Sequence, residues 1–397
     1  MSKRRTSSPL RVPGARSREG RGEGPQAAAG VGPGEGVPPP YQDALNRPSG
    51  TRSGRPLEGE RDVPGTTASG AATRWRWVVG IVVSAFFLWV AFRQVEDVGR
   101  VGAALGRANY LWLGPAVLLY LAGLWVRALR WRALLTPVQK LPLGSLFGIL
   151  SIGFLVNNIL PARLGEIARA VLVGRRHEVS RSATLATVVL ERIFDGIVML
   201  LFLGVATVAA GGRVGSDWLG VLVPLTAVAF GGAGIALGVL ALAPTLALGI
   251  AARLLAPFPP RAREAALAFA AKFITGLGVL GDLKLAAITL ATSTLAWLLE
   301  AGVYVAVGQA FGLRSELDAY LLALAVANLG TMIPSSPGYV GTFDALVARS
   351  LGIFGVDGAL ALAYALLVHI SIWLPPTLIG FFYLWRYNLR LSKLTRE

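Results

Sequence analysis

The chain has 397 residues, of which 54% are hydrophobic and only 15% are charged, and its formal net charge is +16. A soluble domain of this length would carry about 25% charged residues, and several apolar runs here exceed the roughly 18 residues that signal a bilayer span. The composition therefore predicts a polytopic helical membrane protein and argues against a β-barrel, whose strands alternate apolar and polar residues.

The excess of positive charge does not predict a nucleic-acid-binding protein. Lysines and arginines gather in the N-terminal tail and between the apolar runs, as in cytoplasmic loops that face anionic lipid headgroups, and no nucleic-acid-binding motif accompanies them. The chain has no cysteine, and its two histidines, His177 and His369, are far apart in sequence. The sequence therefore predicts no disulfide, no metal site and no cofactor.

Three regions follow from the composition along the chain. Residues 1–73 are rich in Pro, Gly, Ser and Arg and almost lack aromatic residues, so we expect a disordered cytoplasmic tail. Residues 74–388 form the predicted transmembrane domain, and residues 389–397 a short cytoplasmic tail. Apolar segments within the domain are expected at about 77–92, 110–126, 144–160, 185–210, 218–243, 285–312, 319–333, 339–355 and 360–384, with a mildly amphipathic stretch at 262–283 on the cytoplasmic surface.

The distribution of basic residues orients these segments, because cytoplasmic loops are enriched in Lys and Arg. The second span is followed by Arg127, Arg130, Arg132 and Lys140, which predict a cytoplasmic loop. The basic stretch 175–181 is also cytoplasmic if residues 144–173 enter the membrane, turn at Pro161 and return to the same side.

The distribution of basic residues near the C-terminus predicts that residues 319–355 enter the membrane from the outside, turn within 333–341 and return to the outside. The predicted fold is therefore all-α, with about six full transmembrane helices, two oppositely oriented broken re-entrant helical hairpins and both termini in the cytoplasm. Oppositely inserted broken helices form the binding sites of many transporters.

The first predicted turn is the stretch "NNILPARLGEIAR", residues 157–169. Pro161 removes a backbone donor, and Asn157 and Asn158 either satisfy the freed backbone groups or contact a ligand directly. Both predicted turns share a Pro-x-x-x-Gly spacing. Their structural residues are Pro161, Gly165, Pro334 and Pro337.

Three charged residues follow Pro161 at helical spacing. Arg163, Glu166 and Arg169 lie at i, i+3 and i+6, which predicts that Glu166 is within reach of both arginines. They form either an ion-pair cluster at the membrane surface or an anion site, because guanidinium groups bind phosphate in a bidentate way. We favour the anion site, because an ion-pair cluster alone would not need the Pro-Gly break.

A second group of charges interrupts the apolar helix predicted at 185–210. Glu191, Arg192 and Asp195 are expected to turn into the helix bundle, either as a buried salt bridge or as a coupling partner for Arg163 or Arg169. Glu300 is a lone acid within another span and either faces a cavity or pairs with an arginine.

The second turn, "IPSSPGYVG", offers hydroxyl and backbone N–H groups in place of charge. Ser335, Ser336, Gly338 and Gly341 are expected to form a backbone nest that binds anions. Asp344, three residues after Gly341, is expected to be an acid in the first turn of the next helix.

With these motifs in view, residues 76–388 resemble the flippase-like membrane family, also known as the lysylphosphatidylglycerol synthase transmembrane region. The resemblance rests on "NNILPARLGEIARA", "SRSATLATVVLERIFDGIVML" and "IPSSPGYVGTFDALV". The third motif departs from the family pattern, which commonly has Gly at the position of Tyr339 and often Glu at that of Asp344. In the best-known members a soluble aminoacyl-transferase domain follows the membrane part. Here the chain stops about a dozen residues after the last span, so we expect no aminoacylation.

The resemblance implies an inner-membrane protein that moves, or helps move, a lipid between leaflets. We expect a multi-pass bacterial protein that is not an enzyme and whose lipid is polar or anionic. The chain has no Gly-x-x-x-x-Gly-Lys-Ser/Thr nucleotide-binding loop, so transport would be downhill or driven by an ion gradient or voltage, with Glu166 and Asp195 as candidate carriers. Two alternatives stay open. One is a scaffold for an enzyme of lipid or envelope synthesis, and the other is an intramembrane transferase. The expected partners are membrane lipids, with a homo-oligomer or a lipid-synthesis enzyme as further options.

Overall fold

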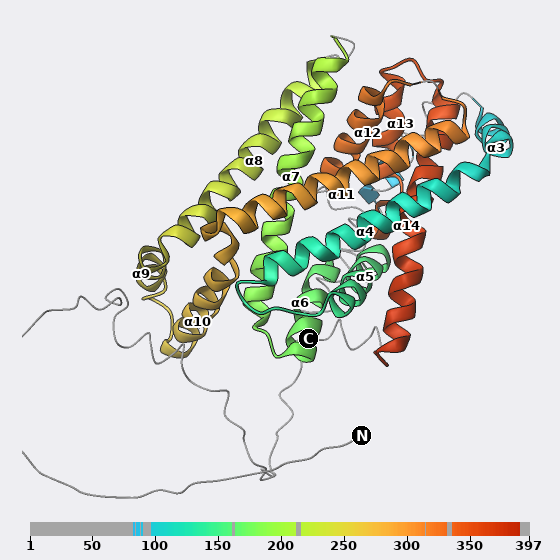
Figure 1. Ribbon diagram of the computed structural model, residues 1–397. Helices are drawn as coiled ribbons and strands as arrows, with labels where there is room; N and C mark the ends of the chain where they lie inside the picture. Colours follow the sequence, from blue (N-terminus) through green and yellow to red (C-terminus); the bar gives the residue numbers. More distant parts are fainter. Residues whose placement is uncertain are drawn as a thin grey trace, which may run out of the picture. The chain divides into compact units, whose positions relative to one another are not determined.

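The computed structural model describes residues 97–160, 163–211, 216–313, 315–331 and 336–389, together with six helical residues between 82 and 89. Within these ranges the chain is helical and has no strand, so the all-α prediction is confirmed (Figure 1). The predicted N-terminal tail, 1–73, and all of the predicted C-terminal tail after residue 389 lie outside the described residues.

The elements are α3 (Val98–Arg107), η1 (Tyr110–Trp112), α4 (Leu113–Leu135), α5 (Leu143–Ile159), α6 (Leu164–His177), α7 (Arg181–Ala209), α8 (Ser216–Leu242), α9 (Pro244–Leu254), α10 (Pro260–Gly276), η2 (Gly278–Gly281), α11 (Leu283–Ala310), α12 (Leu317–Gly330), η3 (Pro337–Tyr339), α13 (Thr342–Gly352) and α14 (Gly358–Arg386).

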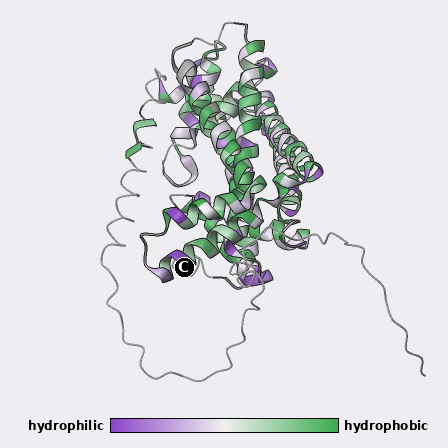
Figure 2. Ribbon diagram, turned by 90° about the vertical axis from the view of Figure 1, so that its left-hand side faces the viewer, coloured by the Kyte–Doolittle hydropathy of each residue, from purple (hydrophilic) through white to green (hydrophobic). Residues whose placement is uncertain are grey.

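Three of the long helices, α7, α11 and α14, begin at side chains that satisfy free backbone N–H groups, as helix N-termini require. Ser180 caps α7, and Asp282 accepts hydrogen bonds from the first N–H groups of α11. Asp357 caps α14 in the same way. After these caps, the residues of each helix are predominantly apolar (Figure 2), so each helix can pack on several neighbours.

Two clusters of buried apolar side chains hold the bundle together. One joins α4, α7, α11, α12, α13 and α14, and Tyr304, Tyr320 and Tyr364 are its largest fully buried side chains. The other joins α4, α5, α6 and α7 around Trp131, which is fully buried. Helix α4 lies along α11 (Figure 1), and α7 contributes to both clusters.

Three described helical segments are long and apolar enough to cross a membrane, namely Tyr110–Leu135, Leu283–Ala310 and Gly358–Arg386. The number becomes four if Val228–Leu242 and Pro244–Leu254, which are bent by 103°, count as one span. The expected total of six full spans stays a prediction.

The two predicted turns coincide with two breaks between short helices. Helices α5 and α6 have 17 and 14 residues, and α12 and α13 have 14 and 11, all fewer than the roughly 20 residues of a full crossing. Helix α5 packs on α6, and α12 packs on α13. Insertion of these pairs as re-entrant hairpins from opposite sides stays a prediction.

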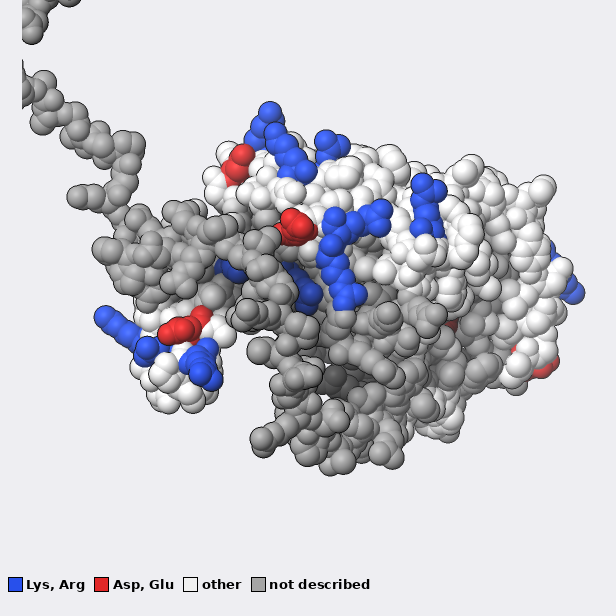
Figure 3. Space-filling model, turned by 90° about the horizontal axis from the view of Figure 1, so that it is seen from below, with Lys and Arg blue, Asp and Glu red and all other residues white. Residues whose placement is uncertain are grey.

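One loop prediction was wrong. Arg127 and Arg130 do not lie in a cytoplasmic loop, because α4 continues to Leu135 and both side chains are buried. Both arginines pair with buried carboxylates inside the bundle, so they do not indicate on which side of the membrane this part of the chain lies. Other basic residues do gather on one face, which contains the ends of α6 and α10 (Figure 3).

Candidate functional site

The break between α5 and α6 is shaped by close backbone contacts. Arg163 is the N-cap of α6 and adopts a left-handed conformation with φ 52°, which is uncommon for a residue other than glycine. The amide oxygen of Asn157 accepts a hydrogen bond of 2.8 Å from the N–H of Gly165. Gly165 lies against the backbone of Gly153, where a Cβ would collide with the carbonyl oxygen. Asn157 thus satisfies a backbone donor of the break.

Asn158 connects the same break to α14. Its side-chain amide donates to the hydroxyl of Thr377 at 2.8 Å and to the carbonyl of Trp373 at 3.2 Å. Both asparagines also line a polar cavity, so the structural and ligand-binding interpretations of these residues are compatible. Pro161, the predicted turn residue, lies outside the described residues.

The second break lies between α12 and α13 and contains three residues with positive φ, namely Gly338, Tyr339 and Gly341. The N–H of Gly341 donates to the carboxylate of Asp344 at 2.8 Å, which gives Asp344 its expected place in the first turn of α13. This hydrogen bond corrects one expectation, because the Gly341 N–H is already satisfied and is not a free nest donor. The predicted residues Pro334 and Ser335 lie outside the described residues.

Arg163 joins the two breaks. Its Nε donates to the hydroxyl of Tyr339 at 2.9 Å, and its NH2 group donates to the carbonyl and the hydroxyl of Thr331, both at 3.0 Å. A Cβ added to Gly338 would lie 2.8 Å from the indole nitrogen of Trp373 and 3.4 Å from the carbonyl oxygen of Asn158, so this turn packs closely on both. The two breaks therefore meet in space, although more than 160 residues separate Arg163 from Thr331 along the chain.

A cluster of buried ion pairs surrounds this junction. Arg127 of α4 contacts Glu300 of α11 at 2.6 Å, and Arg130 of α4 forms an ion pair with Asp195 of α7. Glu191 is shared, because it contacts Arg169 at 2.7 Å, Arg192 at 2.7 Å and Arg130 at 3.2 Å. Buried charges persist only when they are paired and hydrogen-bonded, and this cluster pairs four helices in that way.

Aromatic side chains complete the cluster. The indole N–H of Trp297 donates to Asp195 at 2.8 Å, and the same ring lies under Arg127 at 4.8 Å. Arg169 stacks over Trp131 at 4.0 Å from the ring centre. Cations over aromatic faces are stabilised by the ring quadrupole, most strongly where water is excluded.

The predicted pairing of Glu166 was wrong. Its ion-pair partner is Arg192 of α7 at 3.5 Å, while Arg169 pairs with Glu191 instead. Arg192 also contacts Asp195, three residues further along α7, at 3.7 Å. The side chains of Arg192 and Glu166 are 34% and 24% exposed, so this pair borders the cavity while the rest of the cluster is buried.

The cavity itself measures about 150 Å³, and charged and amide side chains line it together with aromatic ones. Of the predicted site residues, it is lined by Asn157, Asn158, Arg163, Glu166, Arg192, Asp195, Glu300 and Gly338. Arg169, Glu191 and Asp344 are buried behind this lining. Sequence reasoning missed several of its residues, namely Arg127, Trp297, Asn328, Thr331, Tyr339 and His369.

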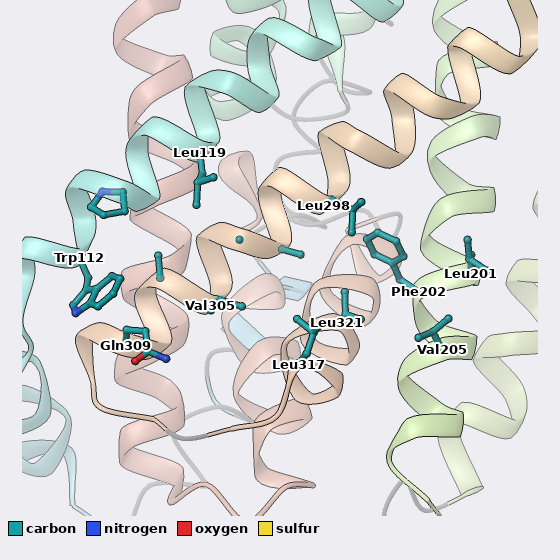
Figure 4. Close-up of a pocket in the computed structure, with 14 residues that line it drawn as sticks. Trp112, Leu119, Leu201, Phe202, Val205, Leu298, Val305, Gln309, Leu317 and Leu321 are labelled. Atoms are coloured by element: carbon teal, nitrogen blue, oxygen red, sulfur yellow. The ribbon is translucent and has the colours of Figure 1, made fainter.

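A second pocket, which we call the apolar groove, has a volume of about 580 Å³ and is lined almost entirely by apolar side chains (Figure 4). It lies among α4, α7, α11 and α12, and Gln309 is its one polar side chain. Helix α11 contributes to both pockets, since Trp297 and Glu300 line the polar cavity and Leu298 and Ala301 line the apolar groove.

Residues 77–380 match the model of the lysylphosphatidylglycerol synthase TM region, which covers most of the chain. The chain belongs to this family. The predicted resemblance is therefore confirmed over the whole region that contains both breaks and the charged cluster.

Two curated relatives of this family member come from archaea. The chain is 26% identical over 311 residues to the glycosyltransferase AglD of Haloferax volcanii, covering 69% of this chain and 48% of that protein. It is 24% identical over 314 residues to a UPF0104 membrane protein of Methanothermobacter thermautotrophicus, covering 75% of this chain and 88% of that protein. The chain thus spans about half the length of AglD. No solved structure matches it.

Proposed function

We propose that this protein moves a lipid with an anionic, phosphate-bearing headgroup between the leaflets of a membrane. The polar cavity would bind the headgroup, and Arg163 would be its principal cationic ligand. The proposal rests on the electrostatics of this residue in comparison with its neighbours.

Arg163 differs from the other four arginines of the site. Arg127, Arg130, Arg169 and Arg192 each contact a carboxylate, whereas the partners of Arg163 among the described residues are the neutral groups of Tyr339 and Thr331. A guanidinium group that lines a cavity without a carboxylate partner favours an anion, and its planar fork suits phosphate oxygens. This uncompensated positive charge is the observation that carries the proposal.

The two pockets favour a lipid over a free anion. A polar cavity of about 150 Å³ is smaller than the roughly 300–1,000 Å³ of pockets that enclose whole ligands, so it fits only a headgroup. The apolar groove on the other face of α11 offers a surface for hydrocarbon. Acyl chains would remain in contact with the membrane or this groove while the headgroup occupies the cavity.

The mechanism that we propose is alternating exposure of the cavity by the two broken helix pairs, inserted from opposite sides of the membrane between six full spans. The breaks meet through hydrogen bonds between neutral groups and Arg163, which an anionic headgroup can replace. The protein would lie in the plasma membrane with both termini in the cytoplasm, and the lipid would leave chemically unchanged.

The test is lipid movement in proteoliposomes that contain the full-length protein. Fluorescent phosphatidylglycerol and fluorescent phosphatidylcholine would be compared in wild type, Arg163→Ala and Arg132→Ala, since Arg132 is an exposed arginine of α4 that serves as the matched control. We expect Arg163→Ala to slow movement of the anionic lipid at least tenfold and Arg132→Ala to have no effect. Wild-type rates in Arg163→Ala would refute the assignment.

A transferase that uses a lipid-linked donor is the second candidate, because the relative AglD is named a glycosyltransferase. The paired acids and arginines of the cavity would then support acid–base chemistry on a phosphate ester. Mass spectrometry of candidate lipids after incubation with the purified protein decides between the two, since a transferase leaves covalent products and a transporter does not.

A further inference from the structure

Both ring nitrogens of His369, on α14, have a hydrogen-bond partner at the second break. Nε2 lies 2.8 Å from the carbonyl oxygen of Gly338, and Nδ1 lies 2.8 Å from the Oδ1 of Asp344. The side chains of His369 and Asp344 are 12% and 1% exposed. The ring of Phe343 packs against the imidazole at 4.8 Å.

The chemistry of these partners sets the number of protons. A carbonyl oxygen only accepts hydrogen bonds, so Nε2 must carry a proton. The contact between Nδ1 and Oδ1 needs one further proton, held either by an imidazolium or by a carboxylic acid. The other oxygen of Asp344 accepts from the N–H of Gly341 and so does not donate. The observed arrangement therefore requires two protons on the pair.

Loss of one proton would break this arrangement. If the imidazole were neutral, with its proton on Nε2, and the carboxylate were ionised, lone pairs on Nδ1 and on Oδ1 would face each other. Their repulsion would separate the two atoms. Asp344 caps α13 and Gly338 lies in the turn before it, so the shared proton joins α14 to the second break.

This proton lies close to the anion site. Tyr339, which follows Gly338, accepts the hydrogen bond from Arg163, and His369 and Arg163 line the same cavity. A proton that fixes the Gly338–Tyr339 turn therefore also fixes the group that orients Arg163. A bound proton and a bound anion additionally attract each other.

Other titratable and charged groups surround the pair. Helix α11 presents Tyr304 and Glu300, α7 presents Arg192 and Asp195, and α4 presents Tyr120 and Arg127. The first turn of α6 adds Glu166, and the two breaks add Arg163 and Tyr339. Among the described carboxylates that line the cavity, Glu166, Asp195 and Glu300 each have an arginine partner. Asp344, which is buried behind this lining, pairs instead with a histidine, the residue type whose charge changes most readily near neutral pH.

We propose that His369 and Asp344 form a proton-binding site whose occupancy is coupled to anion binding at Arg163. The coupling rests on the proposed function, whereas the proton site does not. Because linkage is reciprocal, proton binding strengthens anion binding and anion binding draws in a proton. Transport coupled in this way would carry a proton together with the anionic headgroup.

The proton site is tested by nuclear magnetic resonance of ¹⁵N-labelled histidine in the full-length protein. The chain has two histidines, and His177→Gln leaves His369 as the only signal without touching the cavity. We expect a protonated Nε2 throughout and the loss of one proton from the pair as the pH is raised. Asp344→Asn in the same background should change the Nδ1 signal. An unprotonated Nε2, or ring signals that ignore both pH and Asp344→Asn, would overturn the proton site.

The coupling is tested by calorimetric binding of glycerophosphoglycerol, a phosphodiester that does not titrate near neutral pH. We expect about tenfold tighter binding at pH 6 than at pH 8, with net proton uptake, and a pH-independent affinity in His369→Gln. Equal pH dependence in wild type and His369→Gln would refute the coupling. Unchanged binding in Arg163→Ala would refute the anion site instead, and the histidine titration would stand independently.

Discussion

Arg163 and Tyr339 lie 176 positions apart in the chain, and a hydrogen bond of 2.9 Å joins the Nε of the arginine to the hydroxyl of the tyrosine. Both residues have positive φ, at 52° and 60°. Each therefore occupies a backbone conformation that L-residues disfavour, at the point where one helix pair meets the other. Strained residues of this kind persist where the surrounding structure holds them, and they concentrate at functional sites.

The first prediction separates this strain from function. Glycine adopts the left-handed conformation freely, so Glu178→Gly, at an exposed C-cap with φ 57°, should raise the free energy of unfolding by about 1 kcal/mol. Arg163→Gly gains the same relief but loses the hydrogen bonds to Tyr339 and Thr331, so its stability should change less. Thermal unfolding and lipid movement, measured together, check this. Only Arg163→Gly should lose transport, and a loss of transport in Glu178→Gly would contradict the assignment.

Glu191 should be the most sensitive acid of the cluster. Glu191→Gln leaves Arg130 and Arg169 buried without full compensation, which should lower the free energy of unfolding by about 3–5 kcal/mol. Glu166→Gln is the matched control, because Glu166 is partly exposed and pairs with Arg192 at 3.5 Å, so its loss should be about 1 kcal/mol or less. Denaturation in detergent measures both, and equal effects would show that the cluster is not the main electrostatic anchor.

The close approach at the first break gives a packing prediction. Gly165→Ala places a methyl group against the carbonyl oxygen of Gly153 and should destabilise the protein by about 1–3 kcal/mol. Gly144→Ala, in the first turn of α5, has open space around it and should be neutral or slightly stabilising. A difference in melting temperature between the two variants checks the expectation. Equal melting temperatures would mean that the break can widen without penalty.

The apolar groove can be tested by filling it. Val305→Trp should occupy part of the space between α4 and α11 and slow lipid movement several-fold if acyl chains use this surface. The control is Val208→Trp, near the end of α7, where the side chain is 83% exposed. Transport by Val305→Trp at the rate of the control would remove the groove from the mechanism.

Much of the fold follows from hydropathy. The apolar runs predicted at 144–160, 285–312 and 360–384 correspond closely to α5, α11 and α14, because long apolar runs bury side chains whichever neighbours they meet. The extension of α4 was missed because Arg127 and Arg130 were interpreted as loop markers. The apolar residues that follow them, Trp131, Leu134 and Leu135, continue the helical spacing and could have corrected this.

Both breaks could be predicted from the sequence, but the side-chain contacts that join them could not. The motif around Arg163 marked the first break, because polar residues within apolar runs are costly unless they have a role. Its partners Tyr339 and Thr331 come from the other end of the chain, and no local pattern specifies such a pairing. His369 was dismissed as a metal ligand, yet the same rule on ionisable residues within the membrane would have marked it as a candidate.

The sharing of Glu191 among Arg130, Arg169 and Arg192 also has an evolutionary consequence. One carboxylate serves three guanidinium groups from three helices, so a substitution at any of these positions changes the balance of charge for the others. Contacting residues of this kind have non-additive effects on stability. We therefore expect these four positions to change together in evolution, with a substitution at one accompanied by compensating substitutions at the others.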